Sequence, residues 1–178
     1  MLIKRTDLPA GFQARPTSGA DPHADCSSSV SESDLTVTGG SVGKQFALGV
    51  VFVASASQVY ASVADASASW RRATSPASVK CATALLRREF SKQGIDLVSL
   101  RKIAFPRVSE RTVAYRVRLS ATTEQGPVPL YVDIVALMRS RAQATVIVGS
   151  ALVVPARVDE LRYARLLAGR MARAMRGT

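Results

Sequence analysis

The stretch from Arg111 to Val154 constrains the fold of this 178-residue chain more than any other, because its pattern predicts three consecutive β-strands. The expected strands are Arg111–Thr123, Val128–Arg139 and Gln143–Val154. Along the first strand, apolar residues alternate with polar or small ones, which is typical of a strand with one wet face. In the second and third strands, apolar residues occupy both odd-numbered and even-numbered positions, so side chains on both faces are apolar. This predicts a sheet with one core face and a second face that is at least partly covered.

A turn at Glu124–Pro127 would set the register of the first two strands. The pairs expected on one face are Leu119 with Leu130, Val117 with Val132 and Tyr115 with Ile134, and those on the other are Arg116 with Asp133 and Arg118 with Tyr131. A slip of one residue would mix the two faces. We interpret Arg116–Asp133 as a structural cross-strand pair at a wet end of the second face, so Asp133→Ala should reduce stability only modestly.

A broken helix is predicted between residues 63 and 93. Its first part, Val63–Ala73, follows a serine and has an acidic residue in its first turn, which resembles a capping box. Ser75 and Pro76 then restart the helix, since serine is a good N-cap and proline suits the first helical position.

A second helix, Val158–Met175, is predicted at the C-terminus, with Asp159 and Glu160 placed favourably for the helix dipole. We expect both helical segments to pack on one face of the sheet. The apolar side chains of the other face then have no obvious cover within the chain: Val135, Leu137, Val146 and Val148. A ligand pocket or an oligomer interface would explain that uncovered face equally well.

Shorter elements complete the expected fold. Further strands are predicted at Gly11–Arg15, Asp34–Val37, Gln45–Ser55 and Ile95–Phe105, with a turn at Gly39-Gly40. The stretch 16–34 is rich in Ser, Asp and Pro and is expected to be a flexible polar loop. The prediction is a single α+β domain over residues 1–178. It has an antiparallel sheet of about five to six strands, with the broken central helix and the C-terminal helix on one face.

Two cysteines, Cys26 and Cys81, are too few and too far apart for a zinc site. They form either one disulfide or two buried thiols. We expect the disulfide, because a cysteine in a solvated loop has little reason to be there unless it is bonded. A bond closing a loop of roughly 55 residues would contribute on the order of 4 kcal/mol. It also predicts an extracellular or envelope-associated protein whose signal segment is absent from this numbering.

The net charge of +11 has two interpretations. It could attract a polyanion such as nucleic acid, an anionic surface or an acidic polymer, or it could only keep the protein soluble. No block of five Lys or Arg occurs, and few aromatic residues lie among the basic ones. Specific nucleic-acid recognition is therefore not indicated.

No catalytic or metal-binding pattern was found. The single histidine, His23, lies in the polar loop, the carboxylates are scattered, and no Gly-x-Ser-x-Gly motif occurs. We therefore expect no enzyme, no metal and no cofactor. The candidate ligand-binding residues are aromatic ones that could line an apolar pocket between helix and sheet: Trp70, Phe90, Tyr115 and Tyr131. Ordinary core packing would explain the same side chains.

Several segments together resemble a family of secreted sensor-like domains of actinobacteria, which includes lipoproteins and a kinase ectodomain. They are Asp7-Leu-Pro-Ala-Gly11, Val59-Tyr-Ala-Ser-Val-Ala-Asp-Ala66, the Ser75-Pro76 break and Leu130-Tyr-Val-Asp-Ile134. The resemblance implies a Mog1/PsbP-like fold and a binding or interaction role. The kinase ectodomain type has two disulfides and a cleft, whereas this chain can form only one disulfide.

We therefore expect a non-enzymatic, extracytoplasmic ligand-binding or sensor-like module. Its partner would be an unknown apolar small molecule or protein. The alternative is an interaction or assembly subunit that docks a protein or polyanionic partner through its apolar sheet face or through a basic helix stripe. That stripe consists of Arg162, Arg165, Arg173 and Arg176. A homo-oligomer is compatible with either function.

Overall fold

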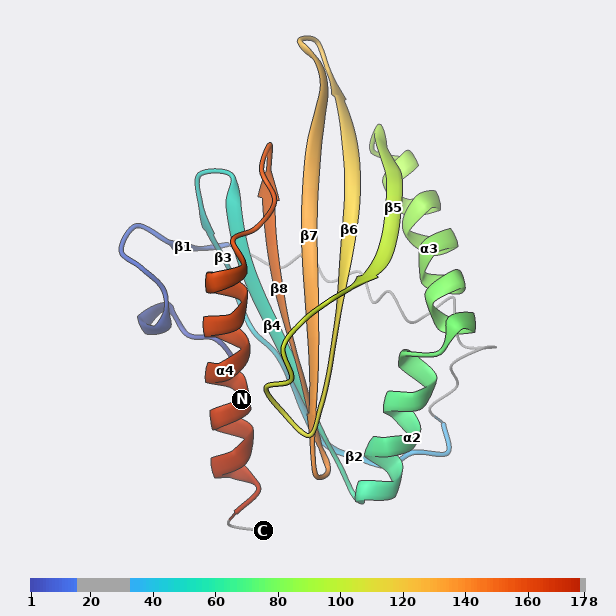
Figure 1. Cartoon of the computed structure of the whole chain (residues 1–178), viewed down its shortest axis with the longest axis vertical. Helices are drawn as coiled ribbons and strands as arrows, with labels where there is room; N and C mark the ends of the chain where they lie inside the picture. The colour runs from blue at the N-terminus through green and yellow to red at the C-terminus, as the bar shows by residue number, and fades with distance from the viewer. Residues whose placement is uncertain (16–32, 177–178) are drawn as a thin grey trace.

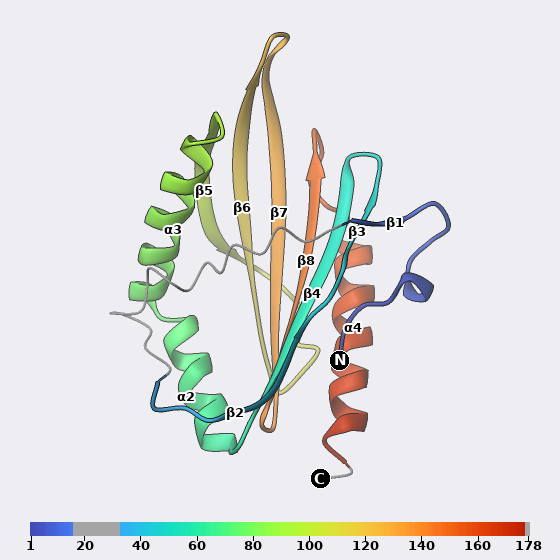
Figure 2. The same cartoon turned by 180° about the vertical axis from the view of Figure 1, so that it is seen from behind.

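The computed structural model describes residues 1–15 and 33–176, which form one antiparallel sheet of eight strands with three α-helices around it. The strands follow the order β1-β3-β4-β8-β7-β6-β5, and β2 pairs with the second half of β4 (Figures 1 and 2). The strands are β1 (Gln13–Arg15), β2 (Val37–Val42), β3 (Gln45–Leu48), β4 (Val51–Tyr60), β5 (Ile95–Ile103), β6 (Arg111–Thr123), β7 (Gly126–Arg139) and β8 (Ala142–Ala151). The helices are the 3-10 turn η1 (Arg5–Asp7) and the α-helices α2 (Val63–Ala73), α3 (Pro76–Ser91) and α4 (Arg157–Ala174).

The α+β class is confirmed, but the predicted strand number was too low. The expected single strand Gln45–Ser55 is two strands, because the chain turns at Gly49 with a φ of 57°, a conformation that suits glycine. Gly39 and Gly40 were predicted as a turn. They lie instead within β2, opposite Val59 and Gln58 of β4.

The predicted pairing register of β6 and β7 is confirmed. Leu119 lies opposite Leu130, Tyr115 opposite Ile134, and Arg116 opposite Asp133. The same alternation continues into β8, where Val135 pairs with Val146. Since paired residues of antiparallel strands point to the same side, these pairs decide which side chains share each face of the sheet.

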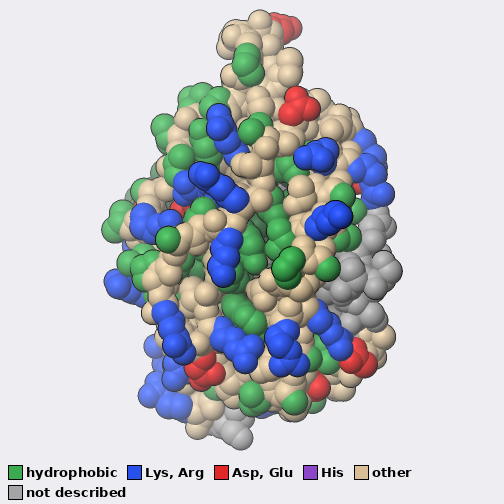
Figure 3. Space-filling view, turned by 45° about the vertical axis from the view of Figure 1, so that its right-hand side comes forward, with side chains coloured by type: hydrophobic (Ala, Val, Ile, Leu, Met, Phe, Trp, Pro, Cys, Tyr) green, Lys and Arg blue, Asp and Glu red, His purple; other side chains and the backbone are tan. Residues whose placement is uncertain are grey.

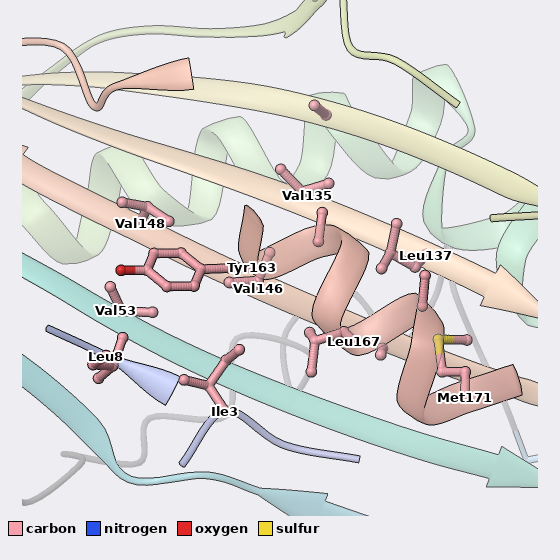
Figure 4. Close-up of a cluster of buried hydrophobic side chains, with 14 of the residues drawn as sticks. Ile3, Leu8, Val53, Val135, Leu137, Val146, Val148, Tyr163, Leu167 and Met171 are labelled. Carbon is pink, nitrogen blue, oxygen red and sulfur yellow. The ribbon is translucent and has the colours of Figure 1, made fainter. Parts of the chain in front are cut away.

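The helices lie on opposite faces of the sheet, which corrects the prediction that both cover one face. Helix α4 packs on the face predicted to have no cover, here called the α4 face. Its Tyr163, Leu167 and Met171 contact the apolar residues of β4, β7 and β8 (Figure 4). Those strand residues are Val53, Val135, Leu137, Val146 and Val148. The apolar residues on this second face of β7 and β8 therefore belong to the ordinary hydrophobic core.

The N-terminal segment completes this layer. Ile3, Leu8 and Phe12 are buried in the same core as α4. Asp7 accepts two hydrogen bonds from Arg170 of α4, at 2.7 and 2.8 Å, so the segment is joined to the helix by an ion pair as well as by packing.

The other face, here called the α2–α3 face, is covered by the broken helix. Trp70 of α2 packs with Tyr60, Val113 and Met138. Farther along the same face, Leu86 and Phe90 of α3 pack against a second cluster. The buried members of that cluster are Leu97, Val117 and Leu119.

Candidate functional site

A groove of about 830 Å³ lies where α2 and α3 diverge from the β5–β6 edge of the sheet. Its size is that of a site for a small molecule. The lining residues come from α2 and α3 (Trp70, Thr74, Pro76, Val79, Lys80), from β5 and the connector after it (Leu100, Arg101, Lys102, Phe105, Arg107, Glu110), and from β6 (Arg111, Thr112, Val113, Tyr115).

The helical wall is fixed by the hydrogen bonds of the α2–α3 break. Ser75 caps α3 by accepting from the backbone N–H of Ser78 at 3.1 Å, and the Ser78 hydroxyl donates to the carbonyl of Arg72 at 2.5 Å. Thr74 donates to the carbonyl of Trp70 at 2.7 Å. The break therefore holds the last turn of α2 and the first turn of α3 in fixed positions on the groove.

The sheet wall is fixed by the connector between β5 and β6. Thr112 Oγ1 accepts from the backbone N–H groups of Val108 and Ser109, both at 3.2 Å. The Ser109 hydroxyl donates to the carbonyl of Met138 at 2.9 Å. These bonds join the connector to β6 and β7, so the groove is largely formed without a ligand.

Basic side chains dominate the rim of the groove. Among the described residues, no carboxylate forms an ion pair with any of four exposed cations: Lys80, Arg101, Lys102 and Arg111. Arg107 donates to the carbonyls of Ser109 and Glu110. Glu110 is the one acidic residue among the described residues of the lining, and its Oε2 already accepts from the Ser140 N–H at 2.9 Å.

The floor of the groove is apolar. Figure 3 shows a hollow with hydrophobic side chains at its base and Lys and Arg side chains on both sides. Leu100, Val113 and Tyr115 of the sheet contribute to this floor, as do Trp70 of α2 and Val79 of α3. Burial raises the pKa of the Tyr115 phenol, so the group stays neutral. The groove thus combines a cationic rim with an apolar base.

The structure brings together two of the four predicted ligand-binding residues. Trp70 and Tyr115 line the groove. Phe90 lies outside it, in the neighbouring apolar cluster of α3, which also contains Leu100. Tyr131 pairs with Arg118 and belongs to the opposite, α4 face of the sheet, so it cannot share a site with the other three.

The predicted Arg116–Asp133 pair is present but buried, which corrects the expectation of a wet end. Arg116 Nε and Nη2 donate to the two carboxylate oxygens of Asp133 at 2.7 and 2.5 Å, and the Asp133 side chain has no exposed surface. Burial alone would raise the pKa of Asp133. The hydrogen bonds from Arg116 and Glu160, with the charges of Arg116 and Arg157, outweigh burial and lower that pKa.

Glu160 of α4 is the third member of this buried cluster, and the sequence interpretation had assigned it only to the helix dipole. Its side chain is fully buried, with Arg157 Nη1 2.8 Å from Oε2 and Arg116 Nη2 4.0 Å from Oε1. Among the described residues, no group donates a hydrogen bond to Oε1. Burial, then the hydrogen bond and charge of Asp133, raise the pKa of Glu160 to about 8, so the carboxyl group is protonated at neutral pH.

Phe105 connects the buried cluster to the groove. The Arg157 guanidinium lies 4.9 Å from the centroid of the Phe105 ring, at the distance of a cation–π contact. Phe105 itself lines the groove and packs against the core below α4. One side chain therefore touches both the candidate site and the first turn of α4.

One of the missed residues, Glu160, could have been identified from the sequence. Glu160 precedes Tyr163, Ala164 and Leu167 at helical spacing, which places it on the apolar stripe of its helix. The rim cations carried no such signal, because they come from α3, β5, the connector and β6, and only the fold brings them together.

Two further predictions involve residues outside the described part of the chain. Cys26, His23 and most of the predicted loop 16–34 lie there. Cys81 is half-buried on α3. Because Cys26 lies outside the described residues, the Cys26–Cys81 disulfide stays a prediction. Within residues 1–15 and 33–176, no group of three or more His, Cys, Asp or Glu could hold a metal ion.

No protein-family model and no curated protein matches this sequence. In the described part of the chain, none of the helices has both the length and the apolar character that crossing a membrane requires.

Proposed function

We propose that the protein is a non-enzymatic, extracytoplasmic ligand-binding or sensor-like module, and that the groove binds a small anionic molecule. The observation that supports this is a set of four cations around one recess that pair with no carboxylate in the described part of the chain: Lys80, Arg101, Lys102 and Arg111.

The position of the charges matters more than their number. The chain has 24 Lys and Arg against 13 Asp and Glu, so basic side chains are common over its surface. Around the groove they surround a recess with low-dielectric walls, which concentrates their field and raises the local concentration of an anion. Like charges held close together also repel, and a bound anion relieves that repulsion.

A titration monitored by Trp70 tests the site. Trp70 is the single tryptophan of the chain and lines the groove, so its emission reports occupancy. We expect at least one anion from a panel of phosphate, citrate, dodecanoate and dodecyl phosphate to change the emission saturably. Lys102→Glu should weaken binding about tenfold or more. Lys44→Glu makes the same charge change at an exposed site outside the groove and should leave binding unchanged.

An absence of any saturable change with every anion of the panel would refute the proposed function. Equal weakening by Lys102→Glu and Lys44→Glu would show that net charge, and not the groove, attracts the anion.

The Mog1/PsbP-like architecture and the location outside the cytosol belong to the same proposal. The antiparallel sheet with a C-terminal helix packed on it supports the architecture. The location depends on the Cys26–Cys81 disulfide. Thiol titration of unfolded protein should find no free thiol before reduction and two after it; two thiols before reduction would remove the argument for the compartment.

A second candidate function is docking of a polyanionic partner on α4. Its favouring observation is a row of exposed arginines along the solvent side of that helix and just past its end: Arg162, Arg165, Arg173 and Arg176. The apolar sheet face no longer supports docking, because α4 covers it. Polyphosphate binding that is weakened by Arg165→Glu and unaffected by Lys102→Glu would favour this candidate over the groove.

A further inference from the structure

We infer that the ligand of the groove is an amphiphilic anion, with one aliphatic chain on the apolar floor and a carboxylate or phosphate head among the rim cations. This inference depends on the proposed function and specifies the class of its ligand.

The floor is the first reason. Val79, Leu100 and Val113 present hydrocarbon surface in a recess that a wholly polar anion would leave uncovered or would dehydrate without gain. An aliphatic chain removes that surface from water and is stabilised in proportion to the apolar area that it covers.

The polar groups of the groove are the second reason. Thr74 and Thr112 line it, but both hydroxyls are already engaged in hydrogen bonds with the backbone. A sugar or a nucleobase needs several free donors and acceptors in its site. Among the described lining residues, the remaining polar groups are the hydroxyl of Tyr115, the indole N–H of Trp70 and the cationic donors at the rim, and the cations suit an anionic head.

The arrangement of the two parts is the third reason. Leu100 lines the groove and also packs in the cluster of Leu97, Val117 and Leu119, so the apolar floor continues into buried hydrocarbon at that end. Lys80 and Lys102 are exposed at the rim, on the helical and sheet walls respectively. A chain directed toward Leu100 therefore leaves its head within reach of cations from both walls.

The test is a chain-length series followed by Trp70 emission, with every amphiphile kept below its micellar concentration. The probes are hexanoate, octanoate, decanoate, dodecanoate, dodecyl phosphate, neutral dodecyl maltoside and inorganic phosphate. We expect affinity to rise about threefold to fourfold for each methylene that the floor covers. Dodecanoate and dodecyl phosphate should bind at least tenfold tighter than dodecyl maltoside, and inorganic phosphate should bind weakest.

Two variants separate the floor from the rim. Val79→Ser places a hydroxyl on the floor and should weaken dodecanoate about fivefold or more, without changing the affinity for inorganic phosphate. Val63→Ser makes the same substitution at an exposed position of α2 outside the groove and should change neither. Unfolding midpoints of both variants show whether each is folded at the temperature of the titration.

The outcomes distinguish this inference from the proposed function. If inorganic phosphate binds as tightly as dodecanoate and remains sensitive to Lys102→Glu, the proposed aliphatic chain of the ligand is refuted and the anion site stands. If dodecyl maltoside binds as tightly as dodecanoate, the anionic head is refuted. If the protein binds phosphatidylglycerol vesicles but not monomeric dodecanoate, the inference that the groove holds an aliphatic chain is overturned. If no anion binds, both proposals fail.

Discussion

Asp133 and Glu160 place two carboxyl groups in the contact between β7 and α4, where neither side chain reaches solvent. Arg116 pairs with Asp133, and Arg157 lies 2.8 Å from Glu160. Burial and the neighbouring Asp133 outweigh both arginines at Glu160, so this carboxyl group keeps its proton at neutral pH. Removing one member of a buried pair leaves another without its partner, which is far more costly than losing an exposed pair.

Asp133→Ala should therefore destabilise the protein by about 3–5 kcal/mol, more than the modest loss that the sequence suggested. The variant leaves the Arg116 guanidinium, whose side chain is only 17% exposed, without its two-point acceptor. Urea unfolding measures the change. Asp34→Ala is the matched control, because it removes the exposed bidentate pair with Arg72 and should have a much smaller effect. Equal losses in the two variants would contradict the buried-pair argument.

Glu160→Gln should change how stability depends on pH. With a folded pKa of about 8, native Glu160 keeps a proton that the unfolded chain releases above its ordinary pKa of 4.5. The free energy of unfolding of the wild type should therefore fall as pH rises from about 5 to about 8, by an amount on the order of 3 kcal/mol. Glutamine cannot ionise, so the variant should lack this decline, and its advantage over the wild type should grow with pH. Parallel pH profiles of the two proteins would disprove the raised pKa.

The elements show which interactions a sequence reports. The register of β6 and β7 and the boundaries of α2 were predictable, because alternation, capping residues and the Ser75-Pro76 break are local signals. The side of the sheet on which α4 packs was not, since both faces of the meander are apolar and either accepts a helix. The β-bulge after Leu97, which lets Leu97 and Leu100 both face α3, is likewise set by pairing with β6.

Gly149→Ala tests the packing of a central strand. A Cβ at Gly149 of β8 would lie 2.0–2.7 Å from three ring atoms of Phe52 in β4, so the ring would have to leave its place over the glycine. We expect a loss of about 1–3 kcal/mol in the free energy of unfolding, as for other overpacked positions. Gly39→Ala in β2 is the matched control, because its Cβ would meet no atom within 4 Å. Thermal unfolding of both variants decides the matter, and an unchanged midpoint for Gly149→Ala would show that Phe52 moves freely.

At the scale of the whole molecule, the sheet lies between α4 and the helices α2 and α3, and the connector from β5 to β6 crosses the sheet toward α4 (Figure 1). Trp70 and Tyr115 were predictable members of the groove, because large aromatic residues on a helix and a facing strand tend to meet. The rim was not predictable, since its cations come from segments that only the tertiary fold brings together. Phe105 lines the groove and also contacts Arg157 of α4, so this one side chain connects the two.

Occupancy of the groove should therefore be detectable in the first turn of α4. With saturating dodecanoate, amide hydrogen exchange should slow in residues 70–80 and 100–115, which line the groove, and to a smaller degree in residues 157–163. The N-terminal segment, residues 2–12, packs beyond α4 and should not change. Arg157→Gln removes the contact with Phe105 at a side chain that is 42% exposed. The variant also loses the hydrogen bond from Arg157 to Glu160, so its exchange is compared with and without dodecanoate. The ligand-induced protection of α4 should be abolished while that of the groove persists, because the contact through Phe105 is lost. Protection of α4 that survives in this variant would mean that the signal reaches the helix through the sheet core instead.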